Sequence, residues 1–171
     1  ASSGALSNRN LIINGGMQVA QRATSKTGSQ ATGYHTLDRW QTYSAATDQL
    51  AVTMSQDTSV PSGQGFSNSM KFLTATAETA IASDEEFRFW QKIESQNLKV
   101  FDWGTSDAKQ ITFSFWVKSS LTGNYALSIY TEDSARQTSK TYTISSADTW
   151  EKKTLTFVGD TGSTFNIDNG T

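Results

Sequence analysis

QITFSFWVKS, residues 110–119, alternates strictly between apolar and polar side chains, and this stretch decides the fold. The apolar positions are Ile111, Phe113, Phe115 and Val117. The positions between and after them are Thr112, Ser114, Trp116 and Lys118. Because successive side chains of a strand point to opposite faces of a sheet, this alternation predicts a half-buried β-strand.

Three more stretches downstream repeat the alternation at intervals of about ten residues. They are NYALSIYTE (124–132), KTYTIS (140–145) and EKKTLTFVG (151–159). The segments between the four stretches, LTGN, EDSARQTS and SSADTW, are rich in residues that favour turns. Four short strands joined by such turns predict an antiparallel sandwich or barrel.

The upstream half of the chain contains three further alternating stretches, at 49–57, 69–76 and 84–94. In the last of these, DEEFRFWQKIE, one face carries the apolar Phe87, Phe89 and Ile93. The other face carries Arg88, Trp90 and Lys92. The residues around it are good helix formers, so a helix is the alternative, but the density of aromatic residues favours a strand. A loop with the single proline, Pro61, separates the first two stretches. The sequence therefore predicts an all-β domain without a clear helix.

The composition excludes several classes of function. The chain has 171 residues, of which 36% are hydrophobic, and this suits one domain with a core over residues 10–171. Residues 1–9 are small and polar, as in a flexible arm or linker. There is no cysteine, which excludes disulfides and thiolate metal sites. The 14 Lys and Arg form no basic block, so no nucleic-acid binding is expected, and no apolar run is long enough for membrane insertion.

Two motifs stand at the start of the chain. In the first, NLIINGGMQVAQR (10–22), the apolar residues 11–13 predict a short strand before an Asn14-Gly15 turn, where Asn14 can bond its own backbone. The second, GYHTLDRWQTY (33–43), embeds Asp38 and Arg39 before Trp40. The residues alone indicate a hairpin or edge strand that closes a sandwich, with Asp38 and Arg39 tying its end.

These two motifs resemble the opening of a domain common in phage tail fibres and related virion proteins. The matching positions are Asn10, Leu11, Asn14, Gly15, Met17, Val19, Gln21, Arg22, Gly33, Tyr34, Asp38, Arg39 and Trp40. That domain is similar in pattern to jelly-roll carbohydrate-binding modules of the galactose-binding-like type. The resemblance therefore implies a two-sheet antiparallel β-sandwich of the jelly-roll kind, truncated after Thr171, where the family pattern continues.

The resemblance also implies a function. The expected protein is a non-enzymatic component of a bacteriophage virion, in a tail fibre or head fibre, that contributes to particle structure and host-surface attachment. Its expected partners are other virion proteins, further copies of itself in a homotrimer, and a host-surface glycan. The alternative is a carbohydrate-binding module that belongs to an enzyme or adhesin.

No arrangement of residues indicates catalysis. The single histidine, His35, lies in a turn, and the sequence has no G-x-S-x-G elbow. The neighbouring acids at 84–86 and 132–133 are typical of solvated turns rather than of facing catalytic carboxylates. Gly159–Ser163 and Asp168–Gly170 offer oxygens to calcium, but no calcium-loop pattern is present. We therefore expect no catalytic residue, no metal and no cofactor.

The aromatic residues give the best candidates for binding. Trp90, Trp116 and Tyr130 are out of phase with the apolar faces of their strands, and Arg88 and Lys92 flank Trp90. If these strands lie side by side, the five side chains share one outer face, on which sugars could stack. A contact between subunits is the favoured interpretation of the same face, because large aromatics are enriched at interfaces. A further tryptophan, Trp103, lies in a loop and fits either role.

Overall fold

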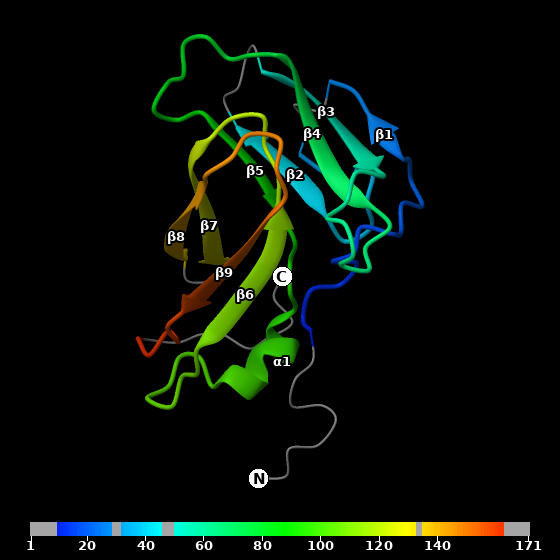
Figure 1. The fold of residues 1–171 in the computed structure, drawn as a ribbon. Coiled ribbons are helices and arrows are strands. Elements are labelled where there is room, and N and C mark those ends of the chain that lie inside the picture. The colour runs from blue at the N-terminus through cyan, green and yellow to red at the C-terminus, as the bar shows by residue number, and fades with distance from the viewer. Residues whose placement is uncertain (1–9, 29–31, 46–49, 133–134, 163–171) are drawn as a thin grey trace. The chain divides into compact units, whose positions relative to one another are not determined.

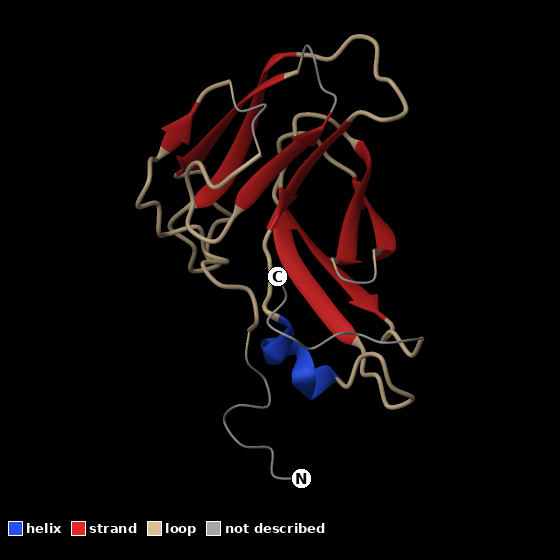
Figure 2. Cartoon of the chain, turned by 180° about the vertical axis from the view of Figure 1, so that it is seen from behind, coloured by secondary structure: helices blue, strands red, loops and turns tan. Residues whose placement is uncertain are grey.

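The computed structural model describes residues 10–28, 32–45, 50–132 and 135–162. It confirms an all-β fold: within these residues there are nine strands, all paired antiparallel, and one short α-helix. Strands dominate the cartoon in Figure 2. The backbone divides into two compact units, residues 1–92 and 93–171. The prediction for residues 1–9 lies outside the described residues.

Unit 1 contains two sheets. Its strands are β1 (Ser25–Lys26), β2 (Gln41–Ala45), β3 (Ala51–Asp57), β4 (Ser69–Thr76) and β5 (Glu86–Trp90). One sheet has the order β1-β3-β4 and the other pairs β2 with β5, as Figure 1 shows. The β3–β4 connection is the predicted loop around Pro61, since residues 58–68 contain no strand.

Aromatic rings join the two sheets of unit 1. Phe72 of β4 meets Phe87 and Phe89 of β5 edge-on, with ring centroids 5.9 and 5.1 Å apart. Trp40, just before β2, stacks on Phe89 at 4.7 Å. Met54 of β3, the register partner of Phe72, is completely buried. These contacts form a small sandwich core, because each sheet turns its apolar face toward the other.

Unit 2 also contains two sheets. Its elements are α1 (Ser95–Leu98), the 3₁₀ turn η1 (Lys99–Phe101), β6 (Ile111–Val117), β7 (Gly123–Thr131), β8 (Arg136–Ile144) and β9 (Glu151–Phe157). β6 pairs with β9, and β7 pairs with β8 (Figure 1). Phe115 of β6 meets Tyr142 of β8 edge-on at 5.1 Å, and Tyr142 stacks on Tyr125 of β7 at 5.8 Å. Ile144 and Phe157 complete this core as fully buried side chains.

The two units share one plan. In each, an outer pair of strands encloses an inner hairpin along the chain: β2 and β5 enclose β3–β4, and β6 and β9 enclose β7–β8. In each, the pair and the hairpin form separate sheets that touch through aromatic rings. The units are therefore two small antiparallel sandwiches, and the jelly roll across residues 10–171 stays a prediction.

Three sequence predictions need correction. Residues 11–13 form no strand, because the backbone of Ile13 bonds the side chain of Gln91 instead of a second strand. β8 begins at Arg136, inside the predicted turn, because its polar side chains pair with those of β7. The short helix α1 was not expected, and it covers only Ser95–Leu98. No helix of the described residues is long and apolar enough to span a membrane.

Candidate functional site

Three of the predicted candidates meet in unit 1. Arg88, Trp90 and Lys92 lie together at β5, and the opposite strand adds Tyr43, the register partner of Arg88. The guanidinium of Arg88 lies 5.3 Å from the ring centre of Tyr43 and 5.7 Å from that of Trp90. The ammonium of Lys92 lies 5.6 Å from the Trp90 ring, and the two rings are 5.6 Å apart. We call these four residues the cation–aromatic cluster.

The packing in the core of unit 1 determines to which face of β5 the side chains of the cluster point. Phe87 and Phe89 turn toward Phe72 and fill the sandwich, so the alternate residues of β5 must point to the opposite face. The phase predicted for Trp90 is therefore confirmed. Trp90 is half-buried and Lys92 is exposed, which leaves aromatic surface and a charge within reach of a partner.

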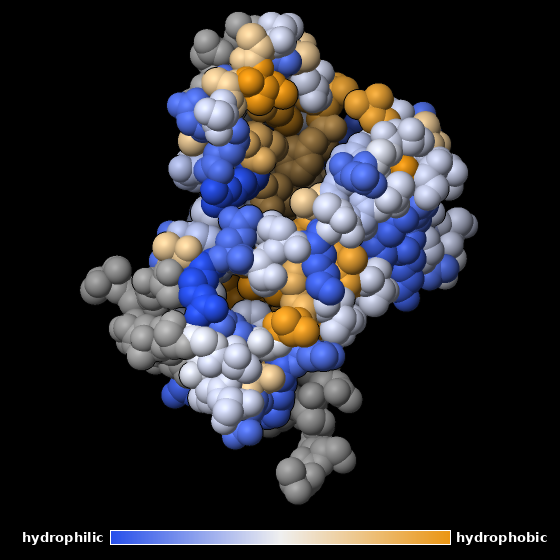
Figure 3. Space-filling model, turned by 90° about the vertical axis from the view of Figure 1, so that its left-hand side faces the viewer, coloured by the Kyte–Doolittle hydropathy of each residue, from blue (hydrophilic) through white to orange (hydrophobic). Residues whose placement is uncertain are grey.

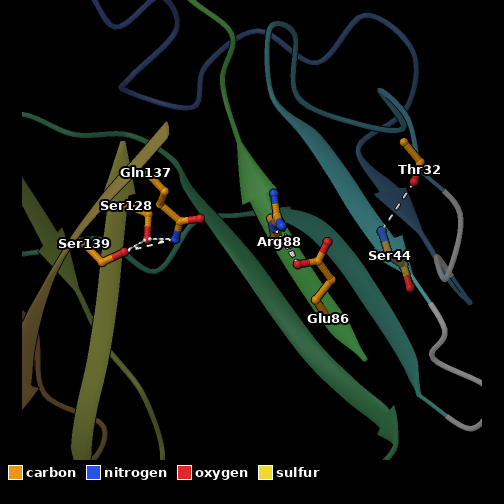
Figure 4. A network of polar contacts seen from close by, with 7 residues as sticks. All are labelled: Thr32, Ser44, Glu86, Arg88, Ser128, Gln137 and Ser139. Atoms are coloured by element: carbon orange, nitrogen blue, oxygen red, sulfur yellow. Dashed lines mark hydrogen bonds and ion pairs between the residues drawn. The ribbon is translucent and has the colours of Figure 1, made fainter. Parts of the chain in front are cut away.

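Glu86 forms an ion pair with Arg88. Its Oε2 accepts a hydrogen bond from Arg88 Nε at 2.9 Å and a second from Nη2, as Figure 4 shows. Such a two-pronged contact fixes the plane of the guanidinium, which then lies over both rings. Because Glu86 neutralises one of the two cations, the cluster and this acid together carry one positive charge. Tyr43 could not be predicted from the sequence, because its place beside Arg88 depends on the pairing of β2 with β5.

The indole of Trp90 carries an unused donor. Its Nε1 is buried and has no hydrogen-bond partner among the described residues. A buried N–H without a partner costs free energy, about 1–3 kcal/mol. The accessible part of the cluster therefore combines planar rings, a fixed guanidinium and an exposed ammonium, which suits recognition of a polar ligand or of another protein surface.

The residues of the two opening motifs have a structural role. Asn14 has a left-handed backbone, with φ of 54°, and its Oδ1 accepts hydrogen bonds from the amides of Gln18 and Val19. Its Nδ2 donates to the carbonyls of Val19 and Asp38, at 2.9 and 3.1 Å. The carbonyl of Asn14 accepts from the indole N–H of Trp40 at 3.2 Å. The first motif is thus bonded directly to the second.

Asp38 and Arg39 extend this network. Asp38 Oδ1 accepts from the amide of Gln21 at 3.1 Å and lies 3.7 Å from the guanidinium of Arg22. Arg39 donates to the carbonyl of Lys92 at 3.2 Å, just beyond β5. Gly15 packs closely on Ile12, because a Cβ there would lie 3.2 Å from the Ile12 side chain, which would have to shift slightly. We call Asn14, Asp38, Arg39 and Trp40 the motif network, and its contacts hold the fold of unit 1.

The other aromatic candidates lie in unit 2. Trp116 is half-buried on β6, and Tyr130 on β7 is 39% exposed. β5, β6 and β7 belong to three different sheets, so they are not the neighbouring strands that one shared sheet face requires. The structure therefore brings together Arg88, Trp90 and Lys92, and it leaves a face common to all five residues as a hypothesis.

Trp103 is a packed residue. Its side chain is only 6% exposed, and its Nε1 donates to the carbonyl of Lys109 at 2.8 Å. Lys109 in turn forms an ion pair with Asp102 at 2.6 Å, which closes the loop after η1. Trp103 therefore presents no open ring for stacking.

The groups considered for catalysis or metal binding are dispersed. His35 is half-buried before β2, and Asp84 is exposed in the β4–β5 loop. Asp160 is paired with Arg136 at 2.9 Å. Asp168–Gly170 lie outside the described residues. Within the described part of the chain, no group of three or more His, Asp or Glu side chains could hold a metal ion.

The surface elsewhere is mixed. Figure 3 shows both hydrophilic and hydrophobic residues on one side of the molecule. Single exposed apolar residues, such as Leu73 and Ile81, are normal on a protein surface. They do not outweigh the cation–aromatic cluster as a recognition surface. Comparisons with protein-family models, curated proteins and solved structures found no match.

Proposed function

We propose that this chain is a non-enzymatic protein of a bacteriophage virion, part of a tail fibre or head fibre. It contributes to the structure of the particle and to attachment to the host surface, and it assembles as a homotrimer with other virion proteins as neighbours. The proposal draws on the resemblance of the two opening motifs to fibre domains. It is compatible with the antiparallel sandwiches of the two units.

The observation that carries the proposal is the cation–aromatic cluster. Tyrosine, tryptophan and arginine are the residues that contribute most to protein interfaces, because they bury much apolar area and still offer hydrogen bonds. Here Arg88 is fixed by Glu86 between two rings, and little side-chain freedom remains to be lost on binding. We infer that the cluster is a contact surface between subunits.

Substitutions in the cluster test this role. We expect Trp90→Ala and Lys92→Glu to dissociate the trimer, measured as molar mass by light scattering after size-exclusion chromatography. Lys92 is exposed, so its substitution leaves the fold of unit 1 intact even if Trp90→Ala does not. Leu73→Ala, on the 56% exposed Leu73 of β4, is the matched control and should remain trimeric. Trimers that survive both cluster substitutions would contradict the assignment of the interface.

The alternative is a carbohydrate-binding module of an enzyme or adhesin, in which the cluster binds sugar on a monomer. The rings of Tyr43 and Trp90 favour it, because sugars stack on aromatic faces. A glycan array distinguishes the two functions. A monomer that loses glycan binding in both cluster variants would establish the module and reject the fibre contact.

A further inference from the structure

Asn14 is followed by a glycine, and such a pair of residues can react with itself. The backbone nitrogen of Gly15 attacks Cγ of Asn14, because glycine has no Cβ to hinder the approach. A bond forms between these two atoms, the bond from Cγ to Nδ2 breaks, and ammonia leaves with the proton of the backbone amide. Water then opens the resulting succinimide ring to aspartate or to isoaspartate. The net change replaces the side-chain amide by a carboxyl group.

In the folded chain, every hydrogen-bonding position of the Asn14 side chain is occupied. Oδ1 accepts from the amides of Gln18 and Val19 at 2.9 and 3.0 Å. Nδ2 donates to the carbonyls of Val19 and Asp38 at 2.9 and 3.1 Å. An asparagine amide offers two acceptor lone pairs and two donor hydrogens, so this one is saturated. Attack on Cγ makes this planar carbon tetrahedral and expels Nδ2, and the reaction therefore has to break these bonds.

The peptide group that contains the attacking nitrogen is held as well. Its oxygen is the carbonyl oxygen of Asn14, which accepts from the amide of Met17 at 3.0 Å and from the indole N–H of Trp40 at 3.2 Å. Trp40 is buried and stacked on Phe89, so this donor keeps its position. Both reacting groups of the Asn-Gly pair are therefore fixed, and the reaction requires at least a local opening of this turn.

The two products do not fit the place that Asn14 occupies. In aspartate, an oxygen replaces Nδ2 and faces the carbonyl oxygens of Val19 and Asp38, which accepted from Nδ2 at 2.9 and 3.1 Å. Three acceptors then meet without a donor, and a charged group left without its hydrogen bonds costs free energy. Isoaspartate adds a methylene to the main chain, inside the turn that the bond from Met17 to Asn14 closes. The modified chain therefore cannot restore these contacts.

We propose that Asn14 is a site of self-modification that reacts only when unit 1 unfolds. In the folded chain, the contacts of Asn14 protect its amide. In an unfolded chain, Asn14 converts to aspartate or isoaspartate, and the native stability is lost. Unfolding then becomes irreversible with time, because the unfolded state is chemically modified before it refolds. This inference depends neither on the cation–aromatic cluster nor on the assembly of subunits.

Peptide mapping by mass spectrometry, in buffer and in guanidinium chloride at one pH and temperature, tests the protection. Trypsin cleaves after Arg9 and Arg22 and releases the peptide that contains Asn14. We expect Asn14 to react at least about tenfold more slowly in buffer, since an opening free energy of about 1.4 kcal/mol already reduces the reactive population tenfold. In the denaturant, Asn14 should react as fast as Asn169, which also precedes a glycine. Equal rates for Asn14 in the two solutions would overturn the proposal.

Gly15→Ala tests the consequence for refolding. Alanine keeps the contacts of Asn14, because Gly15 has no left-handed φ and a Cβ needs only a slight shift of Ile12. Its methyl group hinders the attack on Cγ. After long incubation in denaturant and dilution, this variant should recover its circular dichroism. The unmodified chain should lose recovery in proportion to the modified fraction of Asn14. Asn169 reacts in both proteins, so an equal loss in both would reject the assignment to Asn14.

Asn14→Asp reproduces one product directly. We expect it to unfold at a lower concentration of guanidinium chloride than the unmodified chain, because its carboxylate meets two carbonyl oxygens. Asn10→Asp is the matched control, since it places the same charge in the same motif. Asn10 is exposed and accepts one bond from Ile12 at 3.1 Å, which a carboxylate retains, so this variant should unfold like the unmodified chain. If Asn14→Asp is as stable as Asn10→Asp, deamidation does not block refolding and the proposal fails.

Discussion

Asn14 shows how one residue joins two distant motifs. Its side chain makes four hydrogen bonds, and its backbone occupies the left-handed region that asparagine tolerates better than most residues. The sequence indicated a turn at Asn14 and local bonding by its side chain, and both are present. It could not indicate the bond to Asp38, because 24 residues separate the two and only the folded chain brings them together.

We expect Asn14→Ala to destabilise the protein by roughly 2–4 kcal/mol. Each net hydrogen bond contributes about 1 kcal/mol, and alanine is strained at a positive φ. Asn14→Gly relieves the strain but loses the same bonds, and it should recover only part of the loss. Urea unfolding measures the change. Asn10→Ala is the control, because exposed Asn10 accepts one bond from Ile12, and its loss should cost less than about 1 kcal/mol.

Glu151 gives the chain a dependence on pH. The hydrogen bond from Lys153 and those from the amides of Ser146 and Ser145 lower the pKa of Glu151 below its ordinary value of 4.5. A lowered folded-state pKa stabilises the fold above the ordinary value, and this contribution disappears as the pH falls through the lowered pKa. The free energy of unfolding should therefore fall less between about pH 6 and about pH 3 in Glu151→Gln than in the unmodified chain. An identical loss in both proteins would contradict this assignment.

At the scale of the element, the pairing of β6 with β9 makes a sharp prediction. Thr112 and Thr156 are register partners, and their hydroxyls are 2.9 Å apart. The chain has no cysteine, so an introduced pair would be its only thiols. We expect Thr112→Cys with Thr156→Cys to form a disulfide in air and to stabilise the protein by roughly 3–4 kcal/mol.

The control for this register replaces Thr112 and Thr154, which is paired with Ser114 instead. Mass spectrometry of the native proteins counts the free thiols. The control should keep both, because the two positions are offset along the strands beyond disulfide geometry. Equal oxidation of the two double variants would show that the register is wrong.

Strands with alternating side chains could be predicted from the sequence, because alternation records which face is buried. β5, β6 and β9 lie within the predicted stretches, and β7 begins one residue earlier than predicted, at Gly123. Elements defined by distant partners could not be predicted in this way. The start of β8 depends on bonds such as that between Ser128 and Ser139, with Gln137 beside them (Figure 4). The burial of Trp103 depends on a carbonyl that local patterning cannot identify.

The whole chain repeats one plan in two units. Unit 1 presents the cation–aromatic cluster, which together with Glu86 carries one net positive charge. Sequence patterning located three of the four cluster residues, and in unit 2 it missed the ion pair of Arg136 with Asp160. Arg136 fell in a predicted turn, and only the segment after β9 brings Asp160 to it.

The proposed function requires that this chain assembles with copies of itself into a trimer. Sedimentation equilibrium of the unmodified chain at several concentrations measures this assembly. We expect a single species with about three times the 18.7 kDa mass of one chain. A species that keeps the mass of one chain at every concentration would contradict it.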